Sequence, residues 1–427
     1  MFNFSDIVNH KLFRNVFVYT NFSVIRKAVP FLLLPVLTRY LTPADYGILA
    51  TFQVLFAMAV VFVGLNMHGA VSVNYFKIEK HEFKVYIGNV FLILFVSFNL
   101  TFLIVYVSKS ALSHLTKFPE NWVMVTVLAA LCQFICTLIL TLWQVEQKPM
   151  PYGLFQLFQT VLNVIISLIF VVLLGWQWQG RLLGIIVVSI ISAMISIIII
   201  FKRKYISFSF NIRYIKDALY FGIPLIPHAL GWWLMTSIDR LFINSMVNVA
   251  ATGMYTVGYQ VGMIIGLLAT SFNQAWHPFL FKKLKANNYS TKIKIVKFTY
   301  MYNMGIIILA VTLSLVAPWF LGIFVGKGFH GAYKYVLWIA FGYAFQGMYF
   351  MVVNYIFYIK KTYILAWVTF FSACVNMFLN YFLIKANGAV GAAQATTITF
   401  FVQFIIVWIL SAKVYEMPWF LKNKIKV

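Results

Sequence analysis

Residues 22–47, FSVIRKAVPFLLLPVLTRYLTPADYG, point most directly to the fold class of this 427-residue chain. The stretch is apolar enough to cross a bilayer, yet Arg26 and Lys27 stand side by side within it. A charge at membrane depth costs about 2.5–3.5 kcal/mol on insertion scales. A helix that holds two charges, together with Pro30 and Pro35, should face protein or water instead of lipid. We expect this helix to line an aqueous, positively charged cavity.

The whole chain has the composition of a membrane protein. Hydrophobic residues make up 63% of the sequence and charged residues 10%. Apolar runs of about 20 residues recur along the chain, and the alternating pattern of a membrane barrel is absent. We predict an all-α membrane protein with twelve transmembrane helices. The predicted spans are residues 16–38, 45–65, 87–107, 121–143, 153–174, 182–201, 215–237, 249–271, 297–317, 335–357, 363–384 and 390–412.

The distribution of basic residues predicts the orientation. Residues 1–15 resemble a cytoplasmic lead-in more than a signal peptide. With both termini in the cytoplasm, 23 of the 33 Lys and Arg residues fall on the inner side, 8 fall on the outer side and two lie inside the first span. Membrane proteins collect Lys and Arg in their cytoplasmic loops, so this bias supports the assignment. The net charge of +24 also suggests an anionic partner, and the lack of a soluble domain argues against nucleic acid.

The two halves of the chain resemble each other. The basic loop near 202–214 separates a predicted N-terminal bundle, residues 1–205, from a C-terminal bundle, residues 206–427. Both halves repeat the same spacings in the same order: Gln53 to Asn66 and Gln260 to Asn273 are 13 residues each, and Lys148 to Asn163 and Lys361 to Asn376 are 15 each. A duplicated unit with an even number of spans gives two copies in the same orientation, which is a transporter architecture. We expect the substrate site between the bundles.

Arg26 is the strongest candidate for substrate binding. Tyr19, Ser23, Arg26 and Pro30 share one helical face, with Lys27 at its edge. A guanidinium can bind phosphate oxygens through two hydrogen bonds, so Arg26 is the predicted phosphate contact and Lys27 the secondary one. The alternative is that both side chains extend to the inner headgroups.

Span seven is the partner of span one in the repeat. Pro224 and Pro227 interrupt its backbone hydrogen bonds and should bend it. His228 could carry a proton, bind a sugar hydroxyl or simply pack, and Trp232 could stack on a sugar ring or face lipid. The amides Gln53, Asn66, Gln260 and Asn273 are candidate ligands for a polyhydroxylated substrate, although interhelical hydrogen bonds could explain them.

The nine acidic residues are all predicted in loops or at span ends. Asp239 and Arg240 are interpreted as a local ion pair at the outer end of span seven. A proton relay or a pump for organic cations would need a carboxylate within the membrane. The predicted cavity is therefore positive without internal neutralisation, and its ligand should be negative. The three cysteines lie in apolar runs without metal-ligand spacing, and we expect no metal or cofactor.

The segment at 30–55, PFLLLPVLTRYLTPADYGILATFQVL, adds a family resemblance. It resembles bacterial polysaccharide-repeat flippases for O-antigen or capsule, the Wzx-like branch of the multidrug/oligosaccharidyl-lipid/polysaccharide (MOP) exporter superfamily. The resemblance implies two six-helix bundles in a V, with spans one and seven lining a central cavity. It also implies alternating-access transport of undecaprenyl-pyrophosphate-linked oligosaccharide to the outer leaflet of the bacterial inner membrane. Two further spans of the related peptidoglycan-precursor flippases are missing.

Three hypotheses follow. The first is a flippase for an anionic lipid-linked oligosaccharide, with membrane lipids, a polysaccharide polymerase and chain-length machinery as further partners. The second is a multidrug or metabolite exporter of the same superfamily. The third is an enzyme such as a polymerase or ligase, which would need a sizeable outer loop with catalytic residues. The sequence has neither, so we expect a protein that is not an enzyme.

Overall fold

The computed structural model describes residues 22, 29, 31–285, 288–359, 361 and 363–420. These residues form helices joined by short connections, without any strand. The helices of the first half are α2 (Pro43–Gly64), α3 (Met67–Asn74), α4 (Lys80–Thr116), α5 (Glu120–Val145), α6 (Pro149–Leu168) with η1 (Ile169–Leu173), α7 (Gln177–Lys202), α8 (Ile212–Gly222) and η2 (Ile223–Leu225). Those that follow are α9 (Ile226–Met246), α10 (Val249–Gly262), α11 (Ile264–Lys285), α12 (Tyr289–Phe324), η3 (Lys327–Ala332), α13 (Tyr333–Tyr358), α14 (Tyr363–Asn387) and α15 (Ala389–Val414).

Eleven of the twelve predicted spans can be compared with these helices. Ten helices or continuous helix pairs are long and apolar enough to cross a membrane, and the bent pair at 212–246 makes an eleventh. The twelfth, the predicted span 16–38, lies mostly outside the described residues, with a short apolar helix at Phe31–Tyr40 inside them. The prediction of an all-helical, multi-pass membrane protein is confirmed, and the helix count is consistent with twelve.

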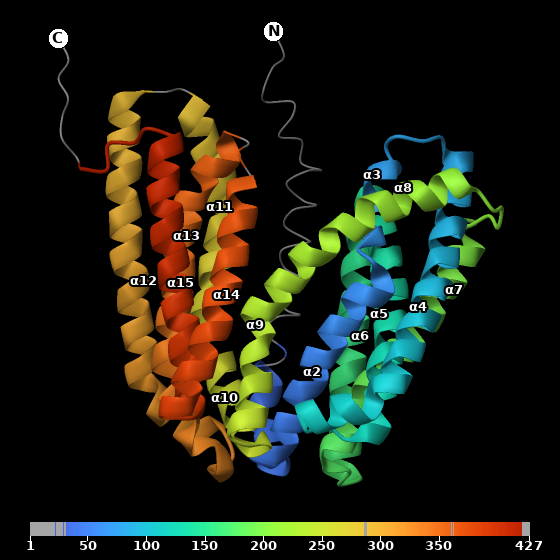
Figure 1. Cartoon of the computed structure of the whole chain (residues 1–427), viewed down its shortest axis with the longest axis horizontal. Coiled ribbons are helices and arrows are strands. Elements are labelled where there is room, and N and C mark those ends of the chain that lie inside the picture. The colour runs from blue at the N-terminus through green and yellow to red at the C-terminus, as the bar shows by residue number, and fades with distance from the viewer. Residues whose placement is uncertain are drawn as a thin grey trace. The chain divides into compact units, whose positions relative to one another are not determined.

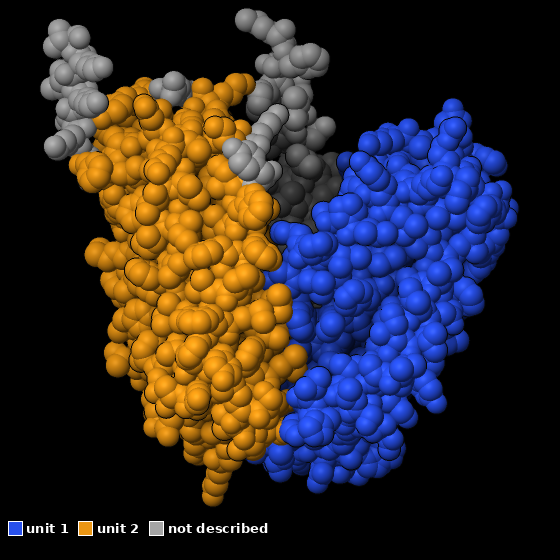
Figure 2. All heavy atoms as spheres, in the orientation of Figure 1, with its two compact units in different colours: residues 1–233 blue, residues 234–427 orange. Residues whose placement is uncertain are grey.

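The chain divides by packing into two compact units, residues 1–233 and 234–427 (Figure 2). Helix α8 and the start of α9 belong to the first unit because α8 packs on α3 and α4 (Figure 1). The boundary predicted at residue 205 concerns the sequence repeat and not this division by packing, so it stays a prediction. The V-shaped arrangement of the bundles also stays a prediction.

Helix lengths follow the predicted repeat. The long helices α4 and α12 have 37 and 36 residues. Helices α5, α7, α13 and α15 have 26 residues each. In the first unit α5 is packed by α2, α4 and α7, and in the second α13 is packed by α10, α11, α12 and α15. Each unit therefore has its own core around the equivalent central helix.

The sequence TPAD of the opening stretch is the start of α2. Thr42 is the N-cap and Pro43 follows it in the first turn. The Asp45 carboxylate accepts a hydrogen bond of 2.8 Å from the Thr42 backbone N–H, and the Thr42 hydroxyl accepts one of 3.2 Å from the Asp45 N–H. This reciprocal capping box satisfies two N–H groups that the helix itself leaves unpaired. The capping box thus explains why a carboxylate is buried here.

Candidate functional site

The predicted site residues are distributed over both units. Arg26 and Lys27 lie outside the described residues. Gln53 is exposed on α2, and His228 is exposed on α9 next to Pro227. Trp232 belongs to the helical backbone of α9. Its neighbour Trp233 donates a hydrogen bond of 3.0 Å from Nε1 to the carbonyl of Val54, which ties α9 to α2 one residue away from Gln53.

The paired amides have different surroundings in the two halves. Asn66 lies between α2 and α3 in the left-handed backbone region, and its side-chain Nδ2 is buried without a hydrogen-bond partner. Its predicted counterpart Asn273, on α11, accepts a hydrogen bond of 2.9 Å from Asn354. Gln260 is half-buried on α10. Within the described part of the chain, no hydrogen bond joins two of the predicted site residues, so the four amides are not one contiguous network.

Two helix breaks meet in the first unit. Helix α2 ends at Leu65 and Asn66, whose φ values of 44° and 52° are left-handed. The regular helix is also interrupted between α8 and α9, where the 3-10 helix η2 with Pro224 follows Gly222. A Cβ on Gly222 would stand 2.1 Å from the Leu65 carbonyl oxygen, so the two interrupted backbones are in direct contact.

Broken helices are tolerated in a membrane where neighbouring helices or water satisfy the freed backbone groups. They are also places where a few residues can absorb a change in backbone angles. Because the two breaks are in contact, a bend between α8 and α9 would displace the end of α2 directly.

The second unit contains a buried ion pair that the sequence analysis placed wrongly. Asp239 lies within α9, seven residues before its end, and is 3% exposed. Its carboxylate accepts hydrogen bonds from the Arg240 guanidinium at 2.9 Å and from the Tyr255 hydroxyl. The Arg240 guanidinium also lies 4.4 Å from the ring centre of Tyr259. The Tyr259 hydroxyl shares a hydrogen bond of 2.7 Å with the Tyr343 hydroxyl.

This cluster corrects two predictions. The pair is not at an exposed helix end, and the acidic residues are not confined to loops and span ends. The physical reason is that α9 continues to Met246 instead of stopping near residue 237, which carries Asp239 into the packed interior. Asp239 is thus a carboxylate buried inside a helix, and it is already paired with a guanidinium.

Arg181 is a second residue that the sequence analysis missed, because it was counted as an outer-loop charge. It lies in the first turns of α7 and is partly buried. Its guanidinium donates to the Asn163 side-chain oxygen at 2.7 Å and to the Ser167 hydroxyl, both on α6. The ion pairs among the described residues are Lys109–Glu120, Lys148–Glu146 and Arg240–Asp239, so this cation is held by neutral groups only. A charge held in this way leaves a net positive potential in the first unit.

The comparisons with known proteins bear on both the sequence and the fold. Residues 12–284 match the family model described as polysaccharide biosynthesis protein. The chain belongs to the polysaccharide biosynthesis protein family. Two relatives from Haemophilus influenzae support this. One is described as an uncharacterized membrane protein, 27% identical over 79% of this chain and 81% of its own length. The other is described as Lsg locus putative protein 1, 22% identical over 82% and 86%.

Solved structures show the fold of this family member. A lipid II flippase, MurJ, in an inward closed conformation superposes with a TM-score of 0.75 at 15% identity, covering 93% of this chain and 87% of that one. An inward-facing multidrug resistance MATE transporter of the MOP superfamily gives a TM-score of 0.71 at 14% identity, covering 91% and 94%. The chain therefore shares the fold of these two proteins, as predicted, and they are described as a flippase and a transporter.

Proposed function

We propose that this protein is a flippase that moves undecaprenyl-pyrophosphate-linked oligosaccharide repeat units from the inner to the outer leaflet. The observation that carries the proposal is the match to a polysaccharide biosynthesis family over 12–284 in a chain with a transporter fold. A polysaccharide pathway needs its lipid-linked intermediates on the outer side, and a MOP-type fold is suited to moving an amphiphile across the membrane. The proposed location is the bacterial inner membrane with both termini in the cytoplasm.

In this proposal Arg26 binds the pyrophosphate and Lys27 assists it. Two phosphates in a region of low dielectric need fixed positive charge, and a guanidinium offers two parallel N–H donors to them. The exposed Gln53 and His228, together with Asn66, Gln260, Asn273 and Trp232, are proposed to contact the sugars. Arg181 supports the electrostatic part of the proposal, because a cation held by neutral groups leaves the first unit attractive to an anion.

The partners of the proposed flippase are the lipid-linked oligosaccharide and the surrounding membrane lipids. A polysaccharide polymerase and chain-length machinery would use the product on the outer side. The two breaks that meet at Gly222 are the proposed points of bending during alternating access.

The direct test is deletion of the gene followed by analysis of the cell envelope. We expect surface polysaccharide to be lost and one lipid-linked oligosaccharide to accumulate in the inner leaflet. Normal surface polysaccharide in the deletion strain, accompanied by raised sensitivity to a panel of drugs, would favour the multidrug or metabolite exporter instead.

The residue assignment has its own test. Arg26→Ala should abolish surface polysaccharide at an unchanged protein level, and Arg26→Lys should restore it in part because charge returns without the two-donor geometry. Arg39→Ala is the matched control, since Arg39 is exposed at the outer end of the helix at 31–40 and should be dispensable. Full export by Arg26→Ala would remove Arg26 from the site.

A further inference from the structure

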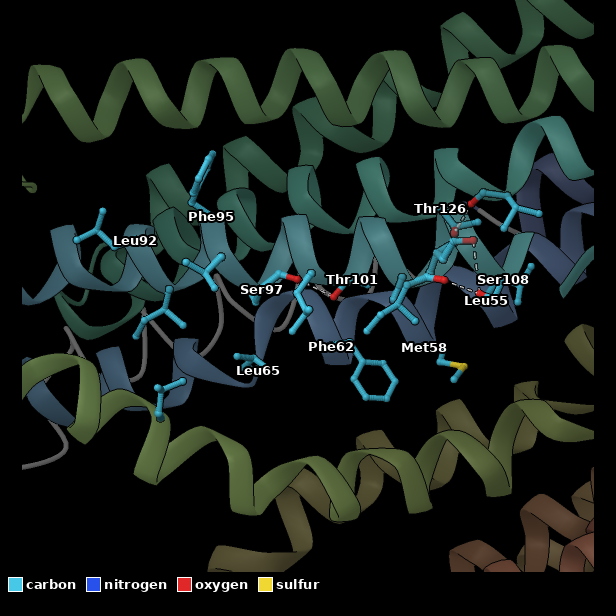
Figure 3. Close-up of a pocket in the computed structure, with 18 of the residues that line it drawn as sticks. Leu55, Met58, Phe62, Leu65, Leu92, Phe95, Ser97, Thr101, Ser108 and Thr126 are labelled. Atoms are coloured by element: carbon cyan, nitrogen blue, oxygen red, sulfur yellow. Dashed lines mark hydrogen bonds between the residues drawn. The ribbon is translucent and has the colours of Figure 1, made fainter. Parts of the chain in front are cut away.

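An apolar groove runs along the first unit between α2 and α4. It has a volume of about 710 Å³ and is lined almost entirely by aliphatic and aromatic side chains (Figure 3). On α4 the lining extends from Leu92 to Leu112, and on α2 it extends from Leu65 back to Leu55. Twenty residues of helix rise about 30 Å, which is the thickness of the hydrocarbon core of a bilayer. The lining on α4 is therefore about as long as the hydrocarbon core of a bilayer is thick.

The few polar groups in the groove are already satisfied by the backbone. Ser97 donates to the Val63 carbonyl at 2.7 Å, and Thr101 donates to the Ser97 carbonyl at 2.7 Å. Ser108 and Thr126 donate in the same way to carbonyls of their own helices. Because no hydroxyl needs a partner, the wall has nothing to offer a sugar or a phosphate, and its occupant must be a hydrocarbon.

The groove is long enough for an extended hydrocarbon chain. Its lining on α4 covers twenty residues, or about 30 Å of helix. A single-chain polyprenyl lipid could therefore lie along it as one strand.

One mouth of the groove is strongly basic. It is lined by Phe210, Ile215 and Leu219, which come from α8 and the loop before it. Residues 202–216 hold five basic side chains, and the acidic Asp217 that follows them accepts hydrogen bonds from Asn74 and Tyr86. Arg213 and Lys216 are exposed on α8, on either side of Ile215. An anionic headgroup at this mouth would sit among these charges while its chain entered the groove.

The loop at the mouth is fixed in place on α4. The Ser207 N–H donates to the Lys84 carbonyl at 3.0 Å, and the Asn89 side chain donates to the Ser209 carbonyl at 2.8 Å. Gly88 allows the close approach, since a Cβ there would stand 2.2 Å from the Ser207 oxygen. At the other end of the loop Tyr205 donates to Glu146 at 2.7 Å, and burial together with that carboxylate raises the pKa of Tyr205 to about 12. The basic mouth is thus a built feature.

We propose that this groove holds the polyprenyl chain of the transported lipid as the lipid enters, with its pyrophosphate at the basic mouth formed by 202–216 before the headgroup moves on to Arg26. The inference rests on the proposed function and assigns the tail to the first unit, along α2 and α4. The occupant is chosen by three matching properties: a wall that accepts hydrocarbon, a length that suits an extended chain, and positive charge at one end.

The test is photo-crosslinking of the full-length protein in nanodiscs. The probe is a polyprenyl pyrophosphate with a diazirine in its tail, and the comparison probe is phosphatidylglycerol with a diazirine in one acyl chain. We expect the polyprenyl probe to label peptides from 92–112, and unlabelled polyprenyl pyrophosphate to compete. Labelling elsewhere, or equal labelling of 92–112 by the phosphatidylglycerol probe without competition, would overturn the proposal and leave an ordinary lipid-facing groove.

Two neighbouring residues supply matched variants. Ile104 and Leu103 are each 58% exposed on α4, but only Ile104 lines the groove. Ile104→Trp should weaken competition by the polyprenyl lipid about tenfold, the loss expected when about two methylene groups leave an apolar surface. Leu103→Trp should behave as wild type. Equal effects of the two variants would contradict the assignment. The crosslinking of the wild-type protein tests the proposal even if neither variant folds.

Reconstituted transport separates this proposal from the proposed function. If wild-type protein in proteoliposomes moves the polyprenyl lipid and Ile104→Trp moves it equally well without labelling of 92–112, the groove assignment alone fails. If wild-type protein moves no polyprenyl lipid and the deletion strain keeps its surface polysaccharide, the proposed function fails and the groove assignment with it.

Discussion

Removing one partner of the Asp239–Arg240 pair should destabilise the second unit far more than removing both. Asp239 is 3% exposed and accepts from the Arg240 guanidinium at 2.9 Å and from the Tyr255 hydroxyl. Breaking a buried pair from one side leaves an unpaired charge and typically costs about 3–5 kcal/mol. We expect a loss of this size in the free energy of unfolding for Asp239→Asn and for Arg240→Met.

The double variant Asp239→Asn with Arg240→Met measures whether the two residues are energetically coupled. If the two costs were independent, they would add to about 6–10 kcal/mol. The double variant buries no unpaired charge and keeps an oxygen at position 239 for the Tyr255 hydroxyl. We therefore expect the double variant to lose about 1–3 kcal/mol, the usual cost of lost polar contacts. The difference is the coupling between the two residues.

A solvated ion pair provides the comparison. Lys109 and Glu120 stand 3.4 Å apart with side chains 39% and 40% exposed. Such pairs contribute about 0–1 kcal/mol, so Lys109→Met and Glu120→Gln should be nearly neutral. The assay is equilibrium unfolding in mixed micelles, followed by tryptophan fluorescence. The description of a coupled buried pair would be refuted in either of two cases. The single variants at 239 and 240 could lose as little free energy of unfolding as the surface-pair variants, or the double variant could lose the sum of the two single losses.

Three further predictions concern backbone contacts. Gly222→Ala should destabilise the first unit by about 1–3 kcal/mol because the new Cβ meets a carbonyl oxygen. Gly231→Ala on α9, where a Cβ has nothing within 4 Å, should stabilise the protein by about 0.5–1 kcal/mol. Thermal unfolding should therefore show a lower melting temperature for Gly222→Ala and a higher one for Gly231→Ala, and shifts of the same sign would contradict this. Gly88→Ala should release the loop before α8, seen as faster hydrogen exchange at 203–211; unchanged exchange would show that the loop tolerates the shift. Asp45→Ala should cost about 1 kcal/mol through the lost capping box, and an unaltered denaturation midpoint would contradict that role.

The class of fold could be predicted from the sequence because the bilayer imposes a simple rule on composition. Apolar runs long enough to cross it and basic residues between them predict spans and sides without any tertiary information. The repeated spacing from Gln53 to Asn66 and from Gln260 to Asn273 similarly predicted equivalent helices in both halves, and the lengths of α4 and α12 agree.

The wrong position of Asp239 has an identifiable cause. The predicted span ended at residue 237, although no glycine or proline follows Gly231 until the N-cap Asn248 starts α10. Absence of a helix breaker was the available signal that α9 continues, and it would have placed Asp239 inside a helix. Its partners Tyr255 and Tyr259 are on the next helix and Tyr343 is on α13, so the ring of tyrosines around the pair could not be read from spacing.

By itself, the sequence determined that the chain crosses a membrane many times and that it carries an excess of positive charge, because these properties depend on residue type and order. The tertiary structure decided which charges are buried, what holds them and which surfaces are hollow. Asp239 is buried against Tyr255, Arg181 is held by neutral groups on α6, and an apolar groove remains between α2 and α4. Those outcomes depend on contacts between residues far apart in the chain, such as Asn89 with Ser209, and packing alone brings such residues together.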